Sequence, residues 1–154
     1  MTATRWLVDA GPLTTLASQL RPEWHWPAGA LAVTALVERE ARRGPGATGP
    51  PTPRERLLDR ATDGRPWITV HRVAVPSPAG QAFARLSQRL DPGEAESIAW
   101  CAHESTDAVF VTQDKTAAFV ALAELGLGRV ALPFDLWCAL RDAGLIDREA
   151  FDRL

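Results

Sequence analysis

The 154-residue sequence has few of the features that build disulfide scaffolds, zinc sites or membrane spans. Its two cysteines, Cys101 and Cys138, lie far apart and form no C-x-x-C pair, which argues against a zinc site or a disulfide framework. No apolar run approaches the ~20 residues that a transmembrane helix needs. The N-terminal segment runs directly from a strand-like stretch into Asp9, unlike a signal peptide. We therefore expect a cytoplasmic protein with no membrane partner.

The motifs of several large enzyme classes are also missing. The sequence contains no G-x-G-x-x-G and no P-loop, and its serines lack a nucleophile-elbow context. The histidines at positions 25, 71 and 103 show no metal-ligand spacing. These absences leave the carboxylates as the side chains most able to carry chemistry.

Charge is distributed unevenly along the chain. Residues 39–65 have a net charge of +3 from seven arginines and four acids, whereas residues 91–124 have a net charge of −6, with Lys115 as their one cation. A basic patch suits a polyanion and an acidic patch suits divalent cations. Ordinary surface charge is the alternative explanation, and a strong excess of arginine over lysine is also consistent with genomic base composition.

Apolar strand-like runs alternate with helical patterns. Strands are expected at residues 5–9, 30–33, 67–73, 108–112 and 129–132. Helices are expected at 11–20, 35–43, 54–60, 79–90, 93–104, 115–125 and 134–143, with a final turn or helix at 147–154. The alternation predicts one α/β domain over residues 1–154, built as a three-layer α/β/α sandwich around a mostly parallel sheet of about five strands.

Two acidic residues follow predicted strands, at the edge where open parallel sheets bind ligands. Asp9 comes directly after one apolar run, and Asp114 lies two residues beyond another. Each also has a structural interpretation, because Asp9 could shape the turn into the first helix and Asp114 could cap the helix that follows. Two carboxylates at the same sheet edge favour a functional site.

A third acid lies on the helix expected at residues 35–43. Its apolar stripe runs through Leu36 and Val37, and Glu40 occupies the next position of that stripe, whereas Glu38 points to the opposite side. Burying a bare carboxylate costs several kcal/mol, so Glu40 needs a cation or a hydrogen-bonded partner. A structural ion pair with an arginine is the alternative.

The segment D-P-G-E-A-E at residues 91–96 places three acids at the start of another helix. The helix dipole alone could explain Asp91 and Glu94. Periodicity does not decide between Glu94 and Glu96, because both flank the buried stripe of the helix. Carboxylates gathered from distant segments repel one another, and a hard divalent cation is the usual reason for such a gathering.

Together these segments resemble a PIN domain, the nuclease fold of many bacterial toxin–antitoxin toxins, over nearly the whole chain. The resemblance rests on V-D-A-G-P-L at 8–13, on Thr34, Val37 and Glu40, and on two further segments, L-D-P-G-E-A-E-S-I-A at 90–99 and V-T-Q-D at 111–114. The D-x-G-E-A-E segment and the tail over residues 125–146 resemble one subgroup of small PIN proteins.

The resemblance implies a ribonuclease that depends on Mg²⁺ or Mn²⁺. Asp9, Glu40, Glu96 and Asp114 would form the catalytic quartet, and the metal ligands would be Asp9, Glu96, Asp114 and Glu94. The subgroup often has an acid where this chain has Gln113, which leaves the site one negative charge lighter.

The same resemblance implies the residues that meet the substrate and the partners of the chain. Thr112 would hydrogen-bond a carboxylate beside the substrate, and Arg39, Arg42 and Arg43 would hold the RNA backbone. The partners would be an RNA substrate, a cognate antitoxin protein and a second copy of the chain. The apolar C-terminal region with Trp137 is the candidate surface for that homodimer.

Two other functions compete with the nuclease. A PIN fold with little catalysis could bind RNA or a protein partner, and Gln113 leaves this alternative open. A doubly wound phosphatase or receiver-type domain also gathers acids at strand ends. It would need a second acid two residues after Asp9, where this chain has Gly11.

Overall fold

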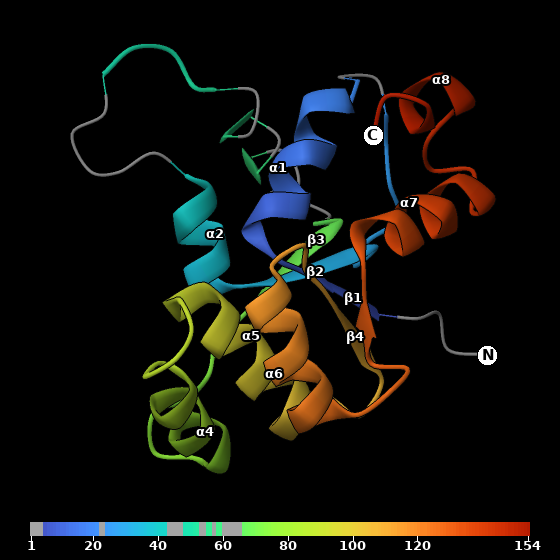
Figure 1. Cartoon of the computed structure of the whole chain (residues 1–154). Helices are drawn as coiled ribbons and strands as arrows, with labels where there is room; N and C mark the ends of the chain where they lie inside the picture. Colours follow the sequence, from blue (N-terminus) through green and yellow to red (C-terminus); the bar gives the residue numbers. More distant parts are fainter. Residues whose placement is uncertain (1–4, 22–23, 43–47, 53–54, 57, 60–65) are drawn as a thin grey trace.

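The computed structural model describes residues 5–21, 24–42, 48–52, 55–56, 58–59 and 66–154. Its strands are β1 (Arg5–Val8), β2 (Leu31–Thr34), β3 (Ile68–His71), β4 (Ala108–Val111) and β5 (Val130–Ala131). They form one five-stranded sheet in the order β3-β2-β1-β4-β5, and every neighbouring pair is parallel (Figure 1). The predicted five-stranded parallel sheet is therefore confirmed.

The helices follow the predicted alternation with the strands. They are α1 (Ala10–Gln19), α2 (Ala35–Ala41), α4 (Pro78–Leu86), α5 (Pro92–His103), α6 (Lys115–Leu125), α7 (Pro133–Asp142) and α8 (Arg148–Phe151). Of the helix expected at 54–60, residues 55–56 and 58–59 are described and are helical, while residues 54, 57 and 60 lie outside the described residues. The basic stretch over residues 39–65 is described only in part. None of the helices in the described segments has the length and apolar character that crossing a membrane requires.

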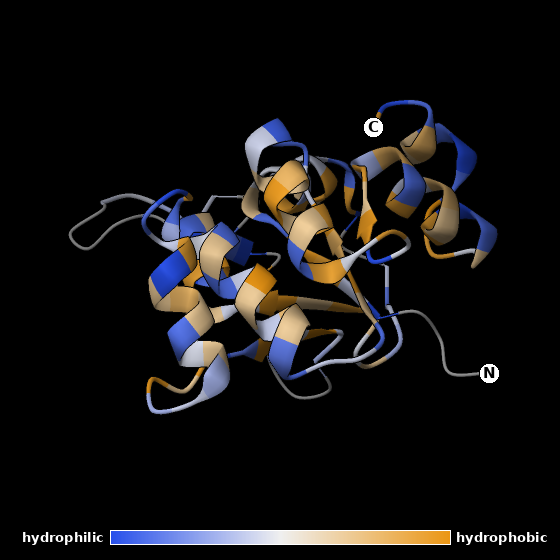
Figure 2. Cartoon of the chain, turned by 60° about the horizontal axis from the view of Figure 1, so that its bottom comes forward, coloured by the Kyte–Doolittle hydropathy of each residue, from blue (hydrophilic) through white to orange (hydrophobic). Residues whose placement is uncertain are grey.

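Each face of the sheet is covered by helices, as the three-layer prediction requires. Successive strand residues point to opposite faces, so fully buried Leu7 and Phe110 belong to one apolar cluster and fully buried Val8 and Val111 to the other. The first cluster includes residues of α4, α5 and α6, and the second includes residues of α1, α2, α7 and α8. Figure 2 shows hydrophobic residues along the strands and hydrophilic residues on outer turns of the helices.

The strand order creates a crevice between two carboxyl ends. From β1 the chain builds β2 and β3 on one side of the sheet, and then returns to place β4 and β5 on the other side. Such a reversal point is where open parallel sheets bind ligands. Asp9 follows β1 and Asp114 follows β4, so the topology brings both acids to this crevice.

The ends of three helices differ by one to four residues from the predicted ranges. Helix α1 begins at Ala10, so Pro12 is its third residue and lies within the turn whose N–H groups lack helical partners. Thr34 precedes α2 without capping it, and its hydroxyl lies 3.2 Å from the Ser97 hydroxyl. Helix α4 ends at Leu86, and a turn occupies residues 87–90.

Candidate active site

Asp9 lies where β1 passes into α1 and is nearly buried, with 7% of its surface exposed. The parallel register of β1 and β4 sets Val8 beside Val111. Thr112, one residue further, therefore donates its hydroxyl hydrogen to Asp9 Oδ2 at 2.9 Å, while Ala10 N–H donates to Oδ1 at 2.8 Å. Burial raises the pKa of Asp9, and these two hydrogen bonds partly offset that rise.

Asp114 is exposed and caps α6. Its Oδ1 accepts a hydrogen bond from Ala117 N–H at 2.8 Å, so the predicted capping role is present. The Asp114 N–H donates to the Thr112 hydroxyl at 3.1 Å. Because Thr112 also donates to Asp9, one buried threonine links the Asp9 carboxylate to the Asp114 backbone, which fits the expectation that Thr112 bonds a carboxylate.

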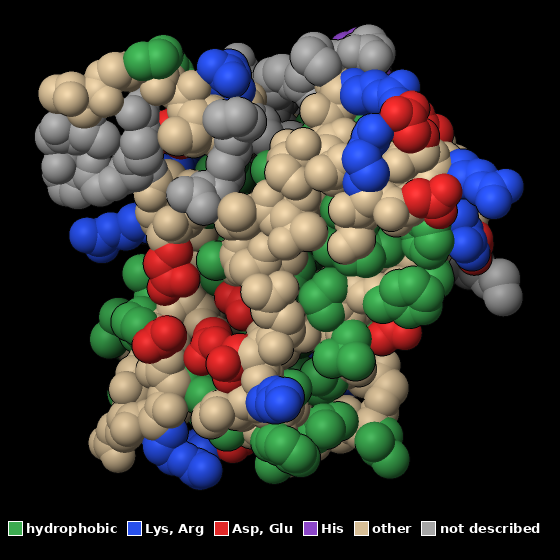
Figure 3. Space-filling view, turned by 45° about the horizontal axis from the view of Figure 1, so that its top comes forward, with side chains coloured by type: hydrophobic (Ala, Val, Ile, Leu, Met, Phe, Trp, Pro, Cys, Tyr) green, Lys and Arg blue, Asp and Glu red, His purple; other side chains and the backbone are tan. Residues whose placement is uncertain are grey.

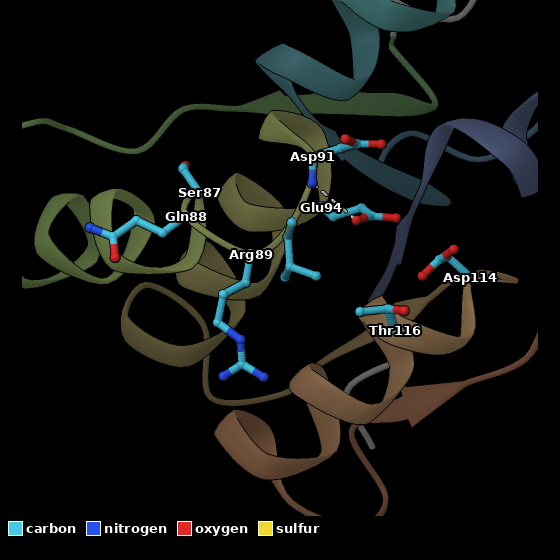
Figure 4. A pocket seen from close by; sticks show the side chains of 8 residues that line it. Ser87, Gln88, Arg89, Asp91, Glu94, Asp114 and Thr116 are labelled. Carbon is cyan, nitrogen blue, oxygen red and sulfur yellow. Dashed lines mark hydrogen bonds between the residues drawn. The ribbon is translucent and has the colours of Figure 1, made fainter.

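Glu94 stands in the first turn of α5 and faces the other acids. Its carboxylate accepts a hydrogen bond from Asp91 N–H at 3.3 Å, as part of a capping box. Burial, followed by the negative charges of Asp9, Asp114 and Asp91, raises the pKa of Glu94 to about 7. Figure 4 shows the Glu94 and Asp114 carboxylates facing each other.

Glu40 reaches the same acidic group from the last turn of α2. The expectation of a buried Glu40 is wrong, since the residue is exposed, but its Oε1 accepts a hydrogen bond from Gly93 N–H at 3.0 Å. A Cβ at position 93 would lie 2.7 Å from that oxygen, so the close approach needs glycine. Although the residue as a whole is exposed, partial loss of water around its carboxylate, followed by the charges of Asp9 and other acids, raises the pKa of Glu40. Glu38 instead pairs with Arg42 at 2.6 Å.

Glu96 is buried and its carboxylate is held by backbone donors. Leu36 N–H donates to Oε2 at 2.8 Å, and Val73 N–H donates to Oε1 at 3.4 Å. Both oxygens are therefore engaged with α2 and with the segment after β3. The structure brings Glu94 to the open acidic group beside Asp9 and Asp114, and it places Glu96 in a tie between helices.

A cavity of about 360 Å³ opens beside these acids. Asp91, Glu94 and Asp114 form its acidic side (Figure 4). Figure 3 shows Asp and Glu side chains gathered on one face of the molecule, with Lys or Arg side chains at the border of this acidic patch. An open cavity with carboxylates on one side can admit a polymer and need not enclose it.

Sequence reasoning missed two parts of this site. Gly93 leaves room for the Glu40 carboxylate to approach the backbone of α5. The only sequence signal for that role is the position of the glycine within the D-P-G-E segment. Arg89 lines the cavity from the turn after α4, where no periodicity marks it. Of the arginines predicted to hold RNA, Arg42 pairs with Glu38 and Asp59, Arg39 is exposed, and Arg43 lies outside the described residues.

The donor chemistry of the site suits hard cations such as Mg²⁺ or Mn²⁺, because its ligating atoms are carboxylate oxygens. Within the described residues, no three His, Cys, Asp or Glu side chains converge closely enough to hold an ion by themselves. Mg²⁺ keeps several water ligands and binds through one or two carboxylates, so a looser acidic group is compatible with it.

Neither the profiles of known protein families, nor curated protein sequences, nor solved structures match this chain. The function of this chain must therefore be inferred from the geometry of the acidic group.

Proposed function

We propose that this chain is a Mg²⁺- or Mn²⁺-dependent endoribonuclease of the PIN type, acting in the cytoplasm. The observation that carries the proposal is the convergence of Asp9, Glu40, Glu94 and Asp114, from four separated segments, on the crevice where the strand order reverses. Burial, followed by mutual repulsion, raises the pKa values of Asp9, Glu40 and Glu94. A bound cation would relieve that repulsion.

Each residue then has a defined role. Asp9 and Asp114, fixed by Thr112, would be the central ligands, and Glu94 would complete the group from the first turn of α5. Glu40, held by Gly93 N–H, would orient a water ligand from the side of α2. A bound divalent ion would supply Lewis-acid activation of water and of the scissile phosphate.

The first experiment measures cleavage of a mixed RNA pool by the purified chain in EDTA, Mg²⁺ or Mn²⁺. Asp9→Asn and Asp114→Asn keep the shape of each side chain and remove its charge. Both should lose cleavage by at least about a hundredfold, because the charge of a metal ligand is lost. Asp142→Asn is the matched control, since Asp142 is an exposed residue at the end of α7 that pairs with Arg141.

A second measurement separates metal binding from cleavage. Mn²⁺ should raise the melting temperature of the wild type and of Asp142→Asn, and much less that of Asp114→Asn. RNA cleavage that persists in EDTA, or that survives in both site variants, would overturn the proposal.

The proposal includes a toxin role with a cognate antitoxin protein. Expression of the wild type in bacteria should arrest growth, whereas Asp114→Asn should not. Growth arrest by both proteins would remove the link between toxicity and the acidic site.

A binding module with little catalysis is the second candidate. It is favoured by the engagement of Asp9 and Glu96, whose carboxylate oxygens already accept protein hydrogen bonds. RNA binding without metal-dependent cleavage, from folded protein free of inhibitor, would favour this candidate over the nuclease.

A further inference from the structure

The cavity beside the acidic group is also lined by residues that are not acidic. Gln88 and Arg89, from the turn after α4, and Thr116, from the first turn of α6, line it together with Glu94 and Asp114. Figure 4 shows the Arg89 side chain extending away from the two facing carboxylates, toward α6, with Thr116 beside Asp114. The opening therefore offers hydrogen-bond donors from Arg89 and Thr116 as well as carboxylates.

The backbone that carries Arg89 is anchored while its side chain is exposed. Arg89 N–H donates to Leu86 O at 3.0 Å, and Leu90 N–H donates to the same oxygen at 3.1 Å. Leu90 is buried in the apolar cluster beneath α4 and α5. The turn thus presents the Arg89 side chain from a fixed base at the rim of the cavity.

Arg89 also differs from most of the described arginines in having no protein partner. Arg85, four residues earlier, makes two hydrogen bonds to Glu124 at 2.7 and 2.9 Å, and Arg129 donates to three backbone carbonyls. No hydrogen bond or ion pair within the described segments engages the Arg89 guanidinium, although Asp91 is only two residues away. A guanidinium left open beside an acidic site can take an anion from outside.

We propose that Arg89, with the Thr116 hydroxyl as a neutral donor, forms a phosphate subsite that binds a backbone phosphate of a single-stranded RNA next to the cleaved bond. This inference rests on the proposed nuclease function and names a residue that positions its substrate. The carboxylates would repel the RNA backbone, and a guanidinium carried by an anchored backbone at the same opening would hold the strand in register with them.

The test measures binding of a short fluorescent single-stranded RNA in EDTA, where cleavage is suppressed, at several salt concentrations. For single strands the slope of log K against log salt changes by about 0.7 for each phosphate contact. Arg89→Gln should reduce the slope by about that amount and weaken binding roughly threefold to tenfold at low salt. Arg89→Lys keeps the charge and should restore most of the slope.

Arg5→Gln is the matched control, because Arg5 is an exposed arginine at the amino end of β1, whereas the acidic site lies beyond the carboxyl ends of the strands. Its slope should equal that of the wild type. Equal slopes for the wild type and Arg89→Gln, or equal losses for both arginine variants, would overturn the subsite. A DNA strand of the same sequence should show the same loss, and a loss confined to RNA would overturn the phosphate assignment.

Metal-dependent cleavage provides the second readout. Arg89→Gln should raise KM for a short RNA by roughly the same factor as its loss of affinity, with kcat nearly unchanged. An unchanged KM with normal metal-dependent cleavage would refute the subsite and leave the nuclease intact. Arg89-dependent binding without any cleavage would refute the nuclease and keep the subsite.

Discussion

Burial and neighbouring negative charges strongly raise the pKa of Glu94. Its pKa rises from 4.5 to about 7, so the folded chain binds this proton more tightly than the unfolded chain does. Stability contributed by Glu94 is therefore present below about pH 4.5 and is lost as the pH rises to about 7. Metal affinity should increase over the same interval, because the carboxylate must lose its proton to bind an ion.

We predict that Glu94→Gln stabilises the metal-free protein at high pH. In EDTA at pH 8 the variant should melt a few degrees above the wild type, because it no longer carries a poorly solvated charge. The melting temperatures should converge below pH 4.5, where the wild-type carboxyl is already neutral. Glutamine keeps an oxygen that can accept the Asp91 N–H bond, so the capping box survives.

Addition of Mn²⁺ at pH 8 provides the control for this prediction. The ion should raise the melting temperature of the wild type more than that of Glu94→Gln. The difference in melting temperature seen in EDTA should therefore shrink or reverse. A wild type that melts above the variant at pH 8 in EDTA would contradict the raised pKa.

Substitution of Gly93 tests the position of the Glu40 carboxylate without changing the Glu40 side chain. In Gly93→Ala the new methyl group would lie 2.7 Å from Glu40 Oε1, so the carboxylate must move. A displacement of this size should reduce RNA cleavage by roughly tenfold to a hundredfold. Melting temperature measured alongside cleavage checks that the variant remains folded.

A double-mutant cycle tests whether Gly93 acts through Glu40. In a Glu40→Ala background, Gly93→Ala should cause no further loss, because the displaced group is already gone. Additive losses would show that the methyl group disturbs α5 itself.

Sequence reasoning located the acids that follow strands and could not choose among those on helix α5. Asp9 and Asp114 were predictable because the ends of parallel strands share one edge. Glu94 and Glu96 both flank the buried stripe, and their different roles arise from long-range packing. Leu36 and Val73, far away in sequence, supply the backbone donors that take up Glu96. No pattern in the sequence predicts which backbone N–H groups will lie beside Glu96.

At the scale of elements, Glu96 ties α5 to the start of α2. Leu36 N–H belongs to the first turn of α2, where backbone N–H groups lack helical acceptors, and Glu96 satisfies it at 2.8 Å. The tie fixes the helix that carries Glu40 against the helix that carries Glu94. Glu96 would then shape the acidic group through the position of α2 as well as through its charge.

We predict that Glu96→Ala destabilises the fold by about 1–3 kcal/mol, because partly buried N–H groups lose their acceptor. That corresponds to roughly 2–12 °C in melting temperature for a chain of this size. Glu96→Gln keeps one acceptor oxygen and should therefore lose less stability than Glu96→Ala. Its RNA cleavage should also fall less than that of Glu94→Gln. If Glu96→Gln kept its stability in EDTA but lost its response to Mn²⁺, its carboxylate would be a metal ligand, as the family resemblance implied.

Element positions were predictable where periodicity and capping residues agree, and the boundaries were less so. Helix α6 begins and ends where the sequence indicated, between Asp114 and Gly126. Helix α4 ends four residues early, because Arg89 and Leu90 both donate to Leu86 O and close a turn instead of continuing the helix. The same turn places Arg89 at the cavity. The unpredicted end of α4 and the unpredicted role of Arg89 therefore have one cause.

At the scale of the whole molecule, the apolar surface shows where a second copy could bind. Trp137 is only 4% exposed and belongs to the core, so it does not form the interface expected of it. Large apolar side chains are instead exposed on α6 and at the start of α7: Phe119, Leu122, Leu132 and Phe134. Figure 3 shows hydrophobic side chains gathered beside the acidic patch. Exposed apolar patches of this kind mark interaction surfaces.

We predict that the chain forms a homodimer through these residues, because association would bury aromatic side chains that water now surrounds. Sedimentation over a wide concentration range should show the dimer for the wild type. Phe119→Ser and Phe134→Ser should each weaken it by at least about tenfold. Val75→Ser is the matched control, since Val75 is at least as exposed as either phenylalanine but precedes α4 on another part of the chain. A wild type that stays monomeric at every concentration would leave this apolar surface to another partner, and the antitoxin would be the first to test.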